Sequence, residues 1–193
     1  MRTTLCLVGL LVPVLAVADF NMPAPGHVEV RDVPGTSGNW QEARTVVDAP
    51  PERVRGWFAD FEIWPHRFRD IEETRVLSRQ GDHTRVWVRS HIMKELVLDV
   101  RVGPQQIVYS AVQDHVDAES RIYLVATGDG RTDVVMQSRA RLTGLLGAMV
   151  PRGMIRDRSR QKLVSDLSDL NRLARARGPR PDVSSLPPTT VAQ

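Results

Sequence analysis

The chain has 193 residues, of which 41% are hydrophobic and 25% are charged, and its net charge is +3. This length can bury one sizeable core, and the composition is that of an ordinary globular domain. A mild excess of basic residues is not enough to indicate a nucleic-acid partner.

Residues 1–18 have the pattern of an export signal peptide. Arg2 precedes an apolar run over residues 5–17, and small residues suited to a cleavage site end the segment, so we expect the mature chain to begin at Asp19. The run is too short to span a membrane comfortably, although an uncleaved anchor is the alternative. Cleavage would also remove Cys6, the single cysteine, which suits an oxidising compartment. We therefore expect a periplasmic or secreted protein.

Residues 19–38 are rich in proline and glycine, and they predict a linker with one brief extended piece at His27–Val33. Polar and apolar residues then alternate over Asn39–Asp48, which predicts the first clear strand.

An aromatic-rich stretch follows, in which Trp57–Phe68 holds five of the ten aromatic residues. Pro51 and Glu52 favour a helix start, because proline suits the first turn and an acidic residue there complements the dipole. Apolar residues then recur at helical spacing: Val54, Trp57, Phe58 and Phe61. A break is predicted at Trp64, because the position before a proline disfavours the α conformation, and a second short helix or turn follows it. This stripe is either plain core or the lid of an apolar cavity.

Six further segments alternate between apolar and polar residues, with short links that include an Asp-Gly turn. Their regular, close spacing indicates an antiparallel meander. Each has one apolar face, so the sheet needs something to cover that face. The segments are Glu73–Gln80, His83–Met93, Lys94–Val102, Gln106–His115, Glu119–Thr127 and Thr132–Thr143.

The cover is predicted at Gly144–Ala176, a long helix that is irregular around Pro151 and Gly153 and amphipathic in its second half. Ser159 takes a sheet-facing position where a large hydrophobic residue would be expected, which leaves room there. Residues 177–193 are rich in proline, serine and threonine, and a disordered tail is predicted.

The order of strand, two short helices, six strands and a long helix resembles the START-like superfamily, also called SRPBCC. Three local sequences carry the resemblance, which covers about residues 40–176: Val-Val-Asp-Ala-Pro-Pro-Glu-Arg-Val at 46–54, Phe-Ala-Asp-Phe-Glu-Ile-Trp-Pro-His-Arg-Phe at 58–68, and Thr-Gly-Leu-Leu-Gly at 143–147. The group includes polyketide cyclase/dehydrase-like proteins, coenzyme Q-binding proteins, plant pathogenesis-related allergens and lipid-transfer START domains.

The resemblance implies an α+β helix-grip domain over residues 39–176. In this fold a curved antiparallel sheet, here of about six to seven strands, wraps the C-terminal helix and leaves a cavity between them. Family members mostly bind lipids, sterols, polyketides or quinones, and some are enzymes, so the fold does not choose among these functions.

Four residues that should face this cavity are small, where a filled core would hold leucine or isoleucine: Ser90, Ser138, Ala140 and Ser159. They predict room for a hydrophobic ligand held by apolar contacts and one or two hydroxyl groups, unless large neighbours fill the space. The full set of cavity-facing candidates is Phe58, Phe61, Val88, Ser90, Ile92, Leu98, Val100, Leu124, Met136, Ser138, Ala140, Met149, Ile155 and Ser159.

The sequence has no spacing typical of a metal site and no fingerprint for a nucleotide, a phosphate or a catalytic serine. We therefore expect no metal and no cofactor, and we assign no catalytic residue. A cyclase- or hydrolase-like enzyme is one alternative, favoured if at least two titratable side chains converge in the cavity; Tyr109, Tyr123, His66 and Asp99 are its acid–base candidates. An interaction module is the other alternative, favoured if the void holds no more than a few waters.

A basic run begins where the long helix starts: Arg152, Arg156, Arg158, Arg160 and Lys162. We interpret it as a docking surface for anionic lipid headgroups, beside a loose, methionine-bearing segment over residues 144–155 that enters the interface. The alternative is a solvated outer helix face. Nucleic acid is not expected, because an exported protein seldom meets it and aromatic residues are not interleaved with this run.

Overall fold

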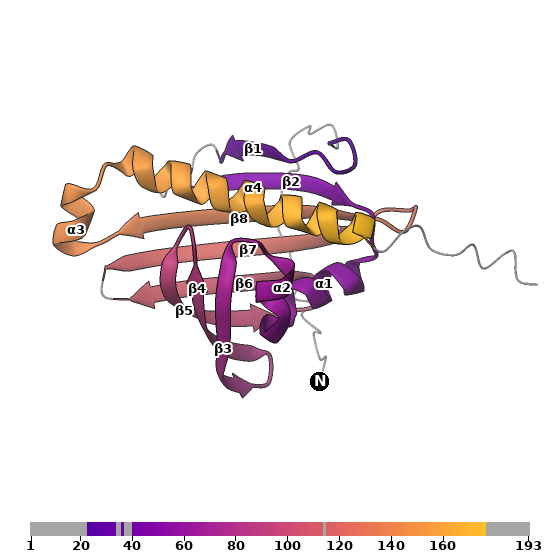
Figure 1. Ribbon diagram of the computed structural model, residues 1–193. Helices are drawn as coiled ribbons and strands as arrows, with labels where there is room; N and C mark the ends of the chain where they lie inside the picture. The colour runs from indigo at the N-terminus through magenta and orange to yellow at the C-terminus, as the bar shows by residue number, and fades with distance from the viewer. Residues whose placement is uncertain (1–22, 34–35, 37–39, 114, 177–193) are drawn as a thin grey trace, which may run out of the picture.

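The computed structural model describes residues 23–176 except 34–35, 37–39 and 114 (Figure 1). The predicted signal peptide and the predicted disordered tail lie outside the described residues and stay predictions. Among the residues that the structure describes, no helix has an apolar stretch long enough to span a membrane.

The described strands form one antiparallel sheet in the order β1-β2-β8-β7-β6-β5-β4-β3. The predicted meander is confirmed as β3 to β8, and β2 pairs with β8. There are eight strands rather than six to seven, because the brief extended piece expected before residue 39 pairs with β2 as a strand of its own. The strands are β1 (Glu29–Asp32), β2 (Gln41–Val47), β3 (Ile71–Gln80), β4 (His83–Ser90), β5 (Lys94–Val102), β6 (Gln106–Gln113), β7 (Val116–Ala126) and β8 (Thr132–Leu142).

The aromatic stretch forms α1 (Pro51–Ala59), the 3-10 turn η1 (Phe61–Ile63) and α2 (Trp64–Arg67). The predicted break at Trp64 is wrong, because this residue has helical dihedral angles (φ −53°, ψ −43°). The chain bends earlier, at Asp60 (φ −92°, ψ 83°), and the proline after Trp64 then sits in the first turn of α2. A proline is tolerated there because its missing N–H would have no partner in the helix.

The predicted C-terminal helix is two helices, α3 (Gly144–Met149) and α4 (Arg152–Ala176). The expected irregularity at Pro151 is a complete break, since proline cannot donate the backbone hydrogen bond that continues a helix. Figure 1 shows α4 lying along one face of the sheet, with α3 at the end of the molecule far from α1.

The core lies between α4 and this face. Three leucines of α4 are no more than 1% exposed: Leu163, Leu167 and Leu170. They belong to one cluster with Ala43 and Val47 of β2 and with the aromatic side chains of α1 and α2. The predicted amphipathic second half of the helix is therefore confirmed.

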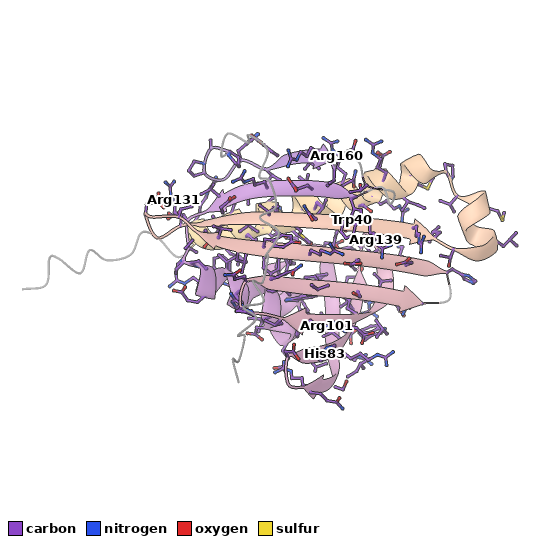
Figure 2. All side chains as sticks on the ribbon, turned by 180° about the vertical axis from the view of Figure 1, so that it is seen from behind. Trp40, His83, Arg101, Arg131, Arg139 and Arg160 are labelled. Atoms are coloured by element: carbon purple, nitrogen blue, oxygen red, sulfur yellow. The ribbon has the colours of Figure 1, made fainter. Side chains whose placement is uncertain are left out.

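The opposite face of the sheet carries charged and aromatic side chains (Figure 2). Arg44 of β2 donates from Nε to Asp133 of β8 at 2.8 Å, and the guanidinium groups of Arg121 and Arg139 lie 4.8 and 5.6 Å from the ring centre of Trp40. These contacts cover the polar side of β2, which explains why all seven of its residues are buried.

Candidate functional site

A cavity of about 120 Å³ lies between α4 and the face of the sheet that it covers. Aromatic rings from α1 and α2 close one part of it, strands β3 to β8 supply apolar and small side chains, and one face of α4 supplies the rest. The cavity-facing candidates that line it are Phe58, Val88, Ser90, Leu98, Met136, Ser138, Ala140 and Ser159. The four small residues singled out from the sequence are all among them.

The other candidates do not line the cavity. Phe61, Val100 and Leu124 are buried in the surrounding core. Ile92 lies past the end of β4 in the turn to β5, because that strand stops at Ser90 rather than Met93.

The two remaining candidates, Met149 and Ile155, lie on either side of the helix break. Met149 on α3 is 71% exposed, and Ile155 in the first turn of α4 is half-buried. The break at Pro151 separates α3 from α4, so the helical register that brings Ser159 to the cavity does not continue back through it.

The aromatic part of the wall is held by hydrogen bonds to one carbonyl. The indole Nε1 of Trp64 donates to the Phe58 carbonyl oxygen at 3.2 Å, and the Tyr109 hydroxyl donates to the same oxygen at 3.0 Å. The rings of Trp64 and Tyr109 meet edge to face, with centroids 5.7 Å apart. Burial, with the nearby Asp166 carboxylate as a second cause, raises the pKa of Tyr109 well above its ordinary value. Its hydroxyl is therefore a fixed donor at neutral pH.

An ionic group forms another part of the wall. On α4, Ser159, Lys162, Leu163 and Asp166 recur at i, i+3, i+4 and i+7, so they share one helix face, and all four line the cavity. The Nζ atom of Lys162 lies 2.5 Å from Oδ1 of Asp166 and 3.2 Å from Oδ2 of Asp70. We call Lys162, Asp166 and Asp70 the ionic triad.

The electrostatics of the triad follow from its burial. Burial alone lowers the pKa of Lys162, but the Asp166 and Asp70 carboxylates outweigh it and hold the value above the ordinary one. Burial raises the pKa of Asp166, and Lys162 only partly opposes this. One ammonium therefore faces two carboxylates, and Asp166 binds a proton more readily than an exposed aspartate does.

Two aspartates also join α4 to the neighbouring loops. Oδ1 of Asp70 accepts a hydrogen bond from the Ile92 amide at 2.8 Å, in the turn between β4 and β5. Asp169, whose side chain is fully buried, accepts from the amide and the Nε of Arg69 at 2.8 and 2.7 Å. These bonds place the triad where the loop before β3, the β4–β5 turn and the middle of α4 meet.

Comparison of the sequence with protein-family models and with curated proteins finds no match. The structure, by contrast, is similar to solved structures. A START superfamily protein from Mycobacterium smegmatis has a TM-score of 0.63 and 19% identity, covering 72% of this chain and 98% of that one. The Zhui aromatase/cyclase from Streptomyces sp. R1128 has a TM-score of 0.64 and 17% identity, covering 78% of this chain and 96% of that one. A STAR-related lipid transfer protein from Xanthomonas axonopodis has a TM-score of 0.61 and 16% identity, covering 80% and 97%.

The chain has the START-like fold. The predicted α+β helix-grip architecture is confirmed. Identities below 20% indicate a shared fold and do not indicate a shared function.

The acid–base candidates do not converge in the START-like cavity. Tyr109 lines it, Tyr123 is half-buried outside it, His66 is exposed, and Asp99 is an exposed residue 3.8 Å from Arg85. Besides Tyr109, the titratable residues on the wall are Lys94, Glu119, Lys162 and Asp166, and of these Lys162 and Asp166 form an ion pair at 2.5 Å. Sequence reasoning missed this pair because Lys162 was grouped with the arginines around it. The i+3 and i+7 spacing from Ser159 is the signal that would have found both.

Several further wall residues were missed, and most follow from strand periodicity. Leu96, Ala111 and Ser120 stand two positions from Leu98, Tyr109 and Ala118, and alternate residues of a strand share a face. The cavity wall also includes five residues that were not among the candidates: Phe68, Ile71, Met93, Lys94 and Glu119.

The basic run divides in two. Lys162 belongs to the cavity wall and not to a docking surface, which corrects its assignment. Arg156 pairs with Asp32, Arg158 donates to the Ile92 carbonyl oxygen at 3.3 Å, and Arg160 is exposed. The side chain of Arg152 lies outside the described part of the chain.

Three large apolar side chains are exposed close to these arginines in the sequence. Leu145 and Met149 of α3 are 77% and 71% exposed, and Met154 of α4 is 52% exposed. We call these three residues the apolar tip.

Proposed function

We propose that the protein binds a compact hydrophobic small molecule between the sheet and α4. The observation that carries this proposal is the cavity itself, with its mainly apolar wall, its four small residues and a polar group on one side. The similarity to a START superfamily protein, an aromatase/cyclase and a STAR-related lipid transfer protein supports it as analogy.

The cavity volume limits the ligand. Pockets for drug-sized ligands span about 300–1,000 Å³, and this cavity has about 120 Å³. An engineered apolar cavity of about 150 Å³ binds benzene, so a single ring is the right scale for the closed form. A quinone head or a small polyketide-like ring suits this form, whereas a sterol or a lipid chain requires a larger cavity than the closed form has.

The test is native mass spectrometry of the purified protein, both as isolated and after incubation with single-ring aromatic compounds and lipid extracts. We expect a bound small molecule in the protein, and loss of binding in the variants Ser138→Leu and Ala140→Leu, whose added side chains fill the cavity. Ala126→Leu, at an exposed position on β7, is the matched control and should bind normally. A clean apo mass under every condition would contradict the proposal.

A cyclase- or hydrolase-like enzyme is the second candidate, and a specific observation favours it. Two titratable side chains, Lys162 and Asp166, converge in the cavity, as this alternative required. Turnover of a bound polyketide-like substrate that is lost in Lys162→Met while binding persists would establish it. The interaction module is the remaining alternative: a water occupies about 30 Å³ in the liquid, so this cavity of about 120 Å³ has room for roughly four, and the binding experiment above decides between the two.

We also propose that the apolar tip contacts an anionic membrane surface. Exposed leucine and methionine beside the arginines of α4 suit insertion between acidic headgroups. Wild-type protein should float with phosphatidylglycerol vesicles in low salt, and a Leu145→Ser/Met149→Ser variant should not. Leu77→Ser is the control, because Leu77 is an exposed leucine (52%) that lies on the edge strand β3 and not in the apolar tip. This variant should float like the wild type. Equal flotation with phosphatidylcholine vesicles, or none with either, would refute this docking.

Export is the third part of the proposal, and it rests on the pattern of residues 1–18. Expressed with its own N-terminus in a bacterium, the protein should be recovered outside the cytoplasm with Asp19 as its first residue. An intact mass that retains Met1 would show instead that the segment is not cleaved.

A further inference from the structure

The ionic triad has hydrogen-bonding capacity that its own members do not use. An ammonium carries three donors, and Lys162 donates to Oδ1 of Asp166 at 2.5 Å and lies 3.2 Å from Oδ2 of Asp70. The Asp70 side chain is only 2% exposed, and its Oδ2 atom has no hydrogen bond among the described residues. The ammonium 3.2 Å away lies at an ion-pair distance without hydrogen-bond alignment. The triad therefore has one lysine donor to spare and a surplus of carboxylate acceptors.

The charge of the triad selects against some ligands. In the triad two carboxylates share one ammonium, and Asp166 and Lys162 both line the cavity. The other charged residues on the wall, Lys94 and Glu119, have opposite signs and add no net charge. A ligand carboxylate or phosphate placed there would add a third negative charge in a poorly solvated site, which is unfavourable. A group that only accepts hydrogen bonds, such as a carbonyl or an ether, can accept one from Lys162. It cannot donate to the carboxylate oxygens, which remain without a further donor.

A hydroxyl group matches both requirements, because it donates one hydrogen bond and accepts others. It can donate to a carboxylate oxygen of Asp166 and accept from Nζ of Lys162 without adding charge. Ser159 and Ser90 also line the cavity and add neutral hydroxyls beside this point. The rings of Trp64 and Tyr109 also line the cavity, and they suit a flat apolar body.

Resting on the proposed function, we infer that the ligand of this cavity is a neutral, single-ring-sized molecule whose polar end is a hydroxyl group, bound between Lys162 and Asp166. The class comprises phenols and cyclic alcohols, and it excludes carboxylates and phosphate esters. The hydroxyl is the group that distinguishes a correct ligand from an equally apolar one.

The test uses four probes that share one ring and one ethyl group: 4-ethylphenol, 4-ethylanisole, 4-ethylbenzoate and ethylbenzene. Binding is measured at pH 7 by calorimetry and by the fluorescence of the tryptophans, of which Trp64 lines the cavity. Because a hydrogen bond to a charged group is worth at least a factor of ten, we expect 4-ethylphenol to bind about tenfold or more tightly than the anisole or ethylbenzene. The benzoate should bind most weakly.

Two variants then locate the preference. Asp166→Asn and Lys162→Met should reduce the phenol preference to less than about threefold while ethylbenzene still binds. Arg160→Met, an exposed substitution on the same helix, should leave the preference unchanged.

The possible failures are distinct. If all four probes bind equally to the wild type, the hydroxyl assignment is overturned and the cavity remains a hydrophobic binding site. If the benzoate binds most tightly, the charge argument is wrong. If no probe binds and native mass spectrometry finds no other ligand, the proposed function falls as well. The wild-type probe series decides the matter even if both variants fold poorly.

Discussion

Replacing Lys162 by methionine removes the only ammonium of the ionic triad and keeps a side chain of similar length. The Asp70 and Asp166 carboxylates, whose side chains are 2% and 9% exposed, would then face each other without a cation. Removing one partner of a buried ion pair lowers the free energy of unfolding by about 3–5 kcal/mol. Because the Lys162 side chain is 22% exposed, water screens part of the interaction, and we expect a loss of about 2–4 kcal/mol in the free energy of unfolding at pH 7.

The loss should depend on pH in a defined direction. Burial already raises the folded-state pKa of Asp166, and removal of Lys162 raises it further. A carboxyl group with a raised pKa stabilises the fold below its ordinary pKa, and this stability is lost as the pH rises through the folded value. The difference between wild type and Lys162→Met should therefore shrink when the pH is lowered from 7 to 5.

Urea denaturation followed by tryptophan fluorescence measures this effect. With a slope of about 2 kcal/mol per molar urea, the middle of the usual range, the midpoint should fall by roughly 1–2 M. Arg160→Met is the control and should change stability by no more than about 0.5 kcal/mol. The double variant Lys162→Met/Asp166→Leu should recover part of the loss, because an apolar replacement of both partners is often near neutral. If Lys162→Met and Arg160→Met are equally stable at pH 7, the triad is not a buried electrostatic unit.

Three further predictions concern the core. Gln41 is 1% exposed, and neither its amide oxygen nor its amide nitrogen has a hydrogen-bond partner among the described residues. Gln41→Leu should therefore stabilise the fold by about 1–3 kcal/mol in urea titration. A loss of stability would indicate a polar partner for this amide. Leu167 is fully buried, so Leu167→Ala should cost about 2–5 kcal/mol, and a change below 1 kcal/mol would show that α4 is not packed as described. Tyr109→Phe removes a donor to the Phe58 carbonyl and should cost about 1 kcal/mol. Because the folded pKa of Tyr109 is raised, its contribution is complete below the ordinary tyrosine pKa and is lost as the pH rises through the folded value, so wild-type stability should fall in alkali more steeply than that of Tyr109→Phe.

The sheet could be predicted from the sequence because each strand of the meander buries one face and solvates the other. β5 was predicted with its observed bounds, and β4 was extended too far because the turn after Ser90 is itself apolar at Ile92 and Met93. β1 was not counted, since a short strand at the edge of a proline-rich stretch has too few residues to show a period.

The cavity could be predicted only in part. Serine and alanine at sheet-facing positions are visible in the sequence as missing volume, and Ser90, Ser138, Ala140 and Ser159 do line the cavity. Lys162 could not be placed by composition, because a lysine among arginines looks like a solvated helix face. Its partner Asp70 lies 92 positions earlier in the sequence, and only the fold brings the two together at 3.2 Å.

The two halves of α4 differ in burial, and this difference has a consequence for local opening of the domain. Residues 163, 166, 167 and 169–171 are buried and the Asp70 and Asp169 links fall on this half, whereas positions 153–158 are exposed or only half-buried. One continuous helix therefore has a C-terminal half packed into the core and an N-terminal part joined to the rest of the molecule by exposed contacts, the Arg156–Asp32 ion pair and the Arg158 hydrogen bond to the Ile92 carbonyl oxygen. In a hydrogen-exchange experiment, amide protection should drop sharply on passing from Leu163 back toward Met154.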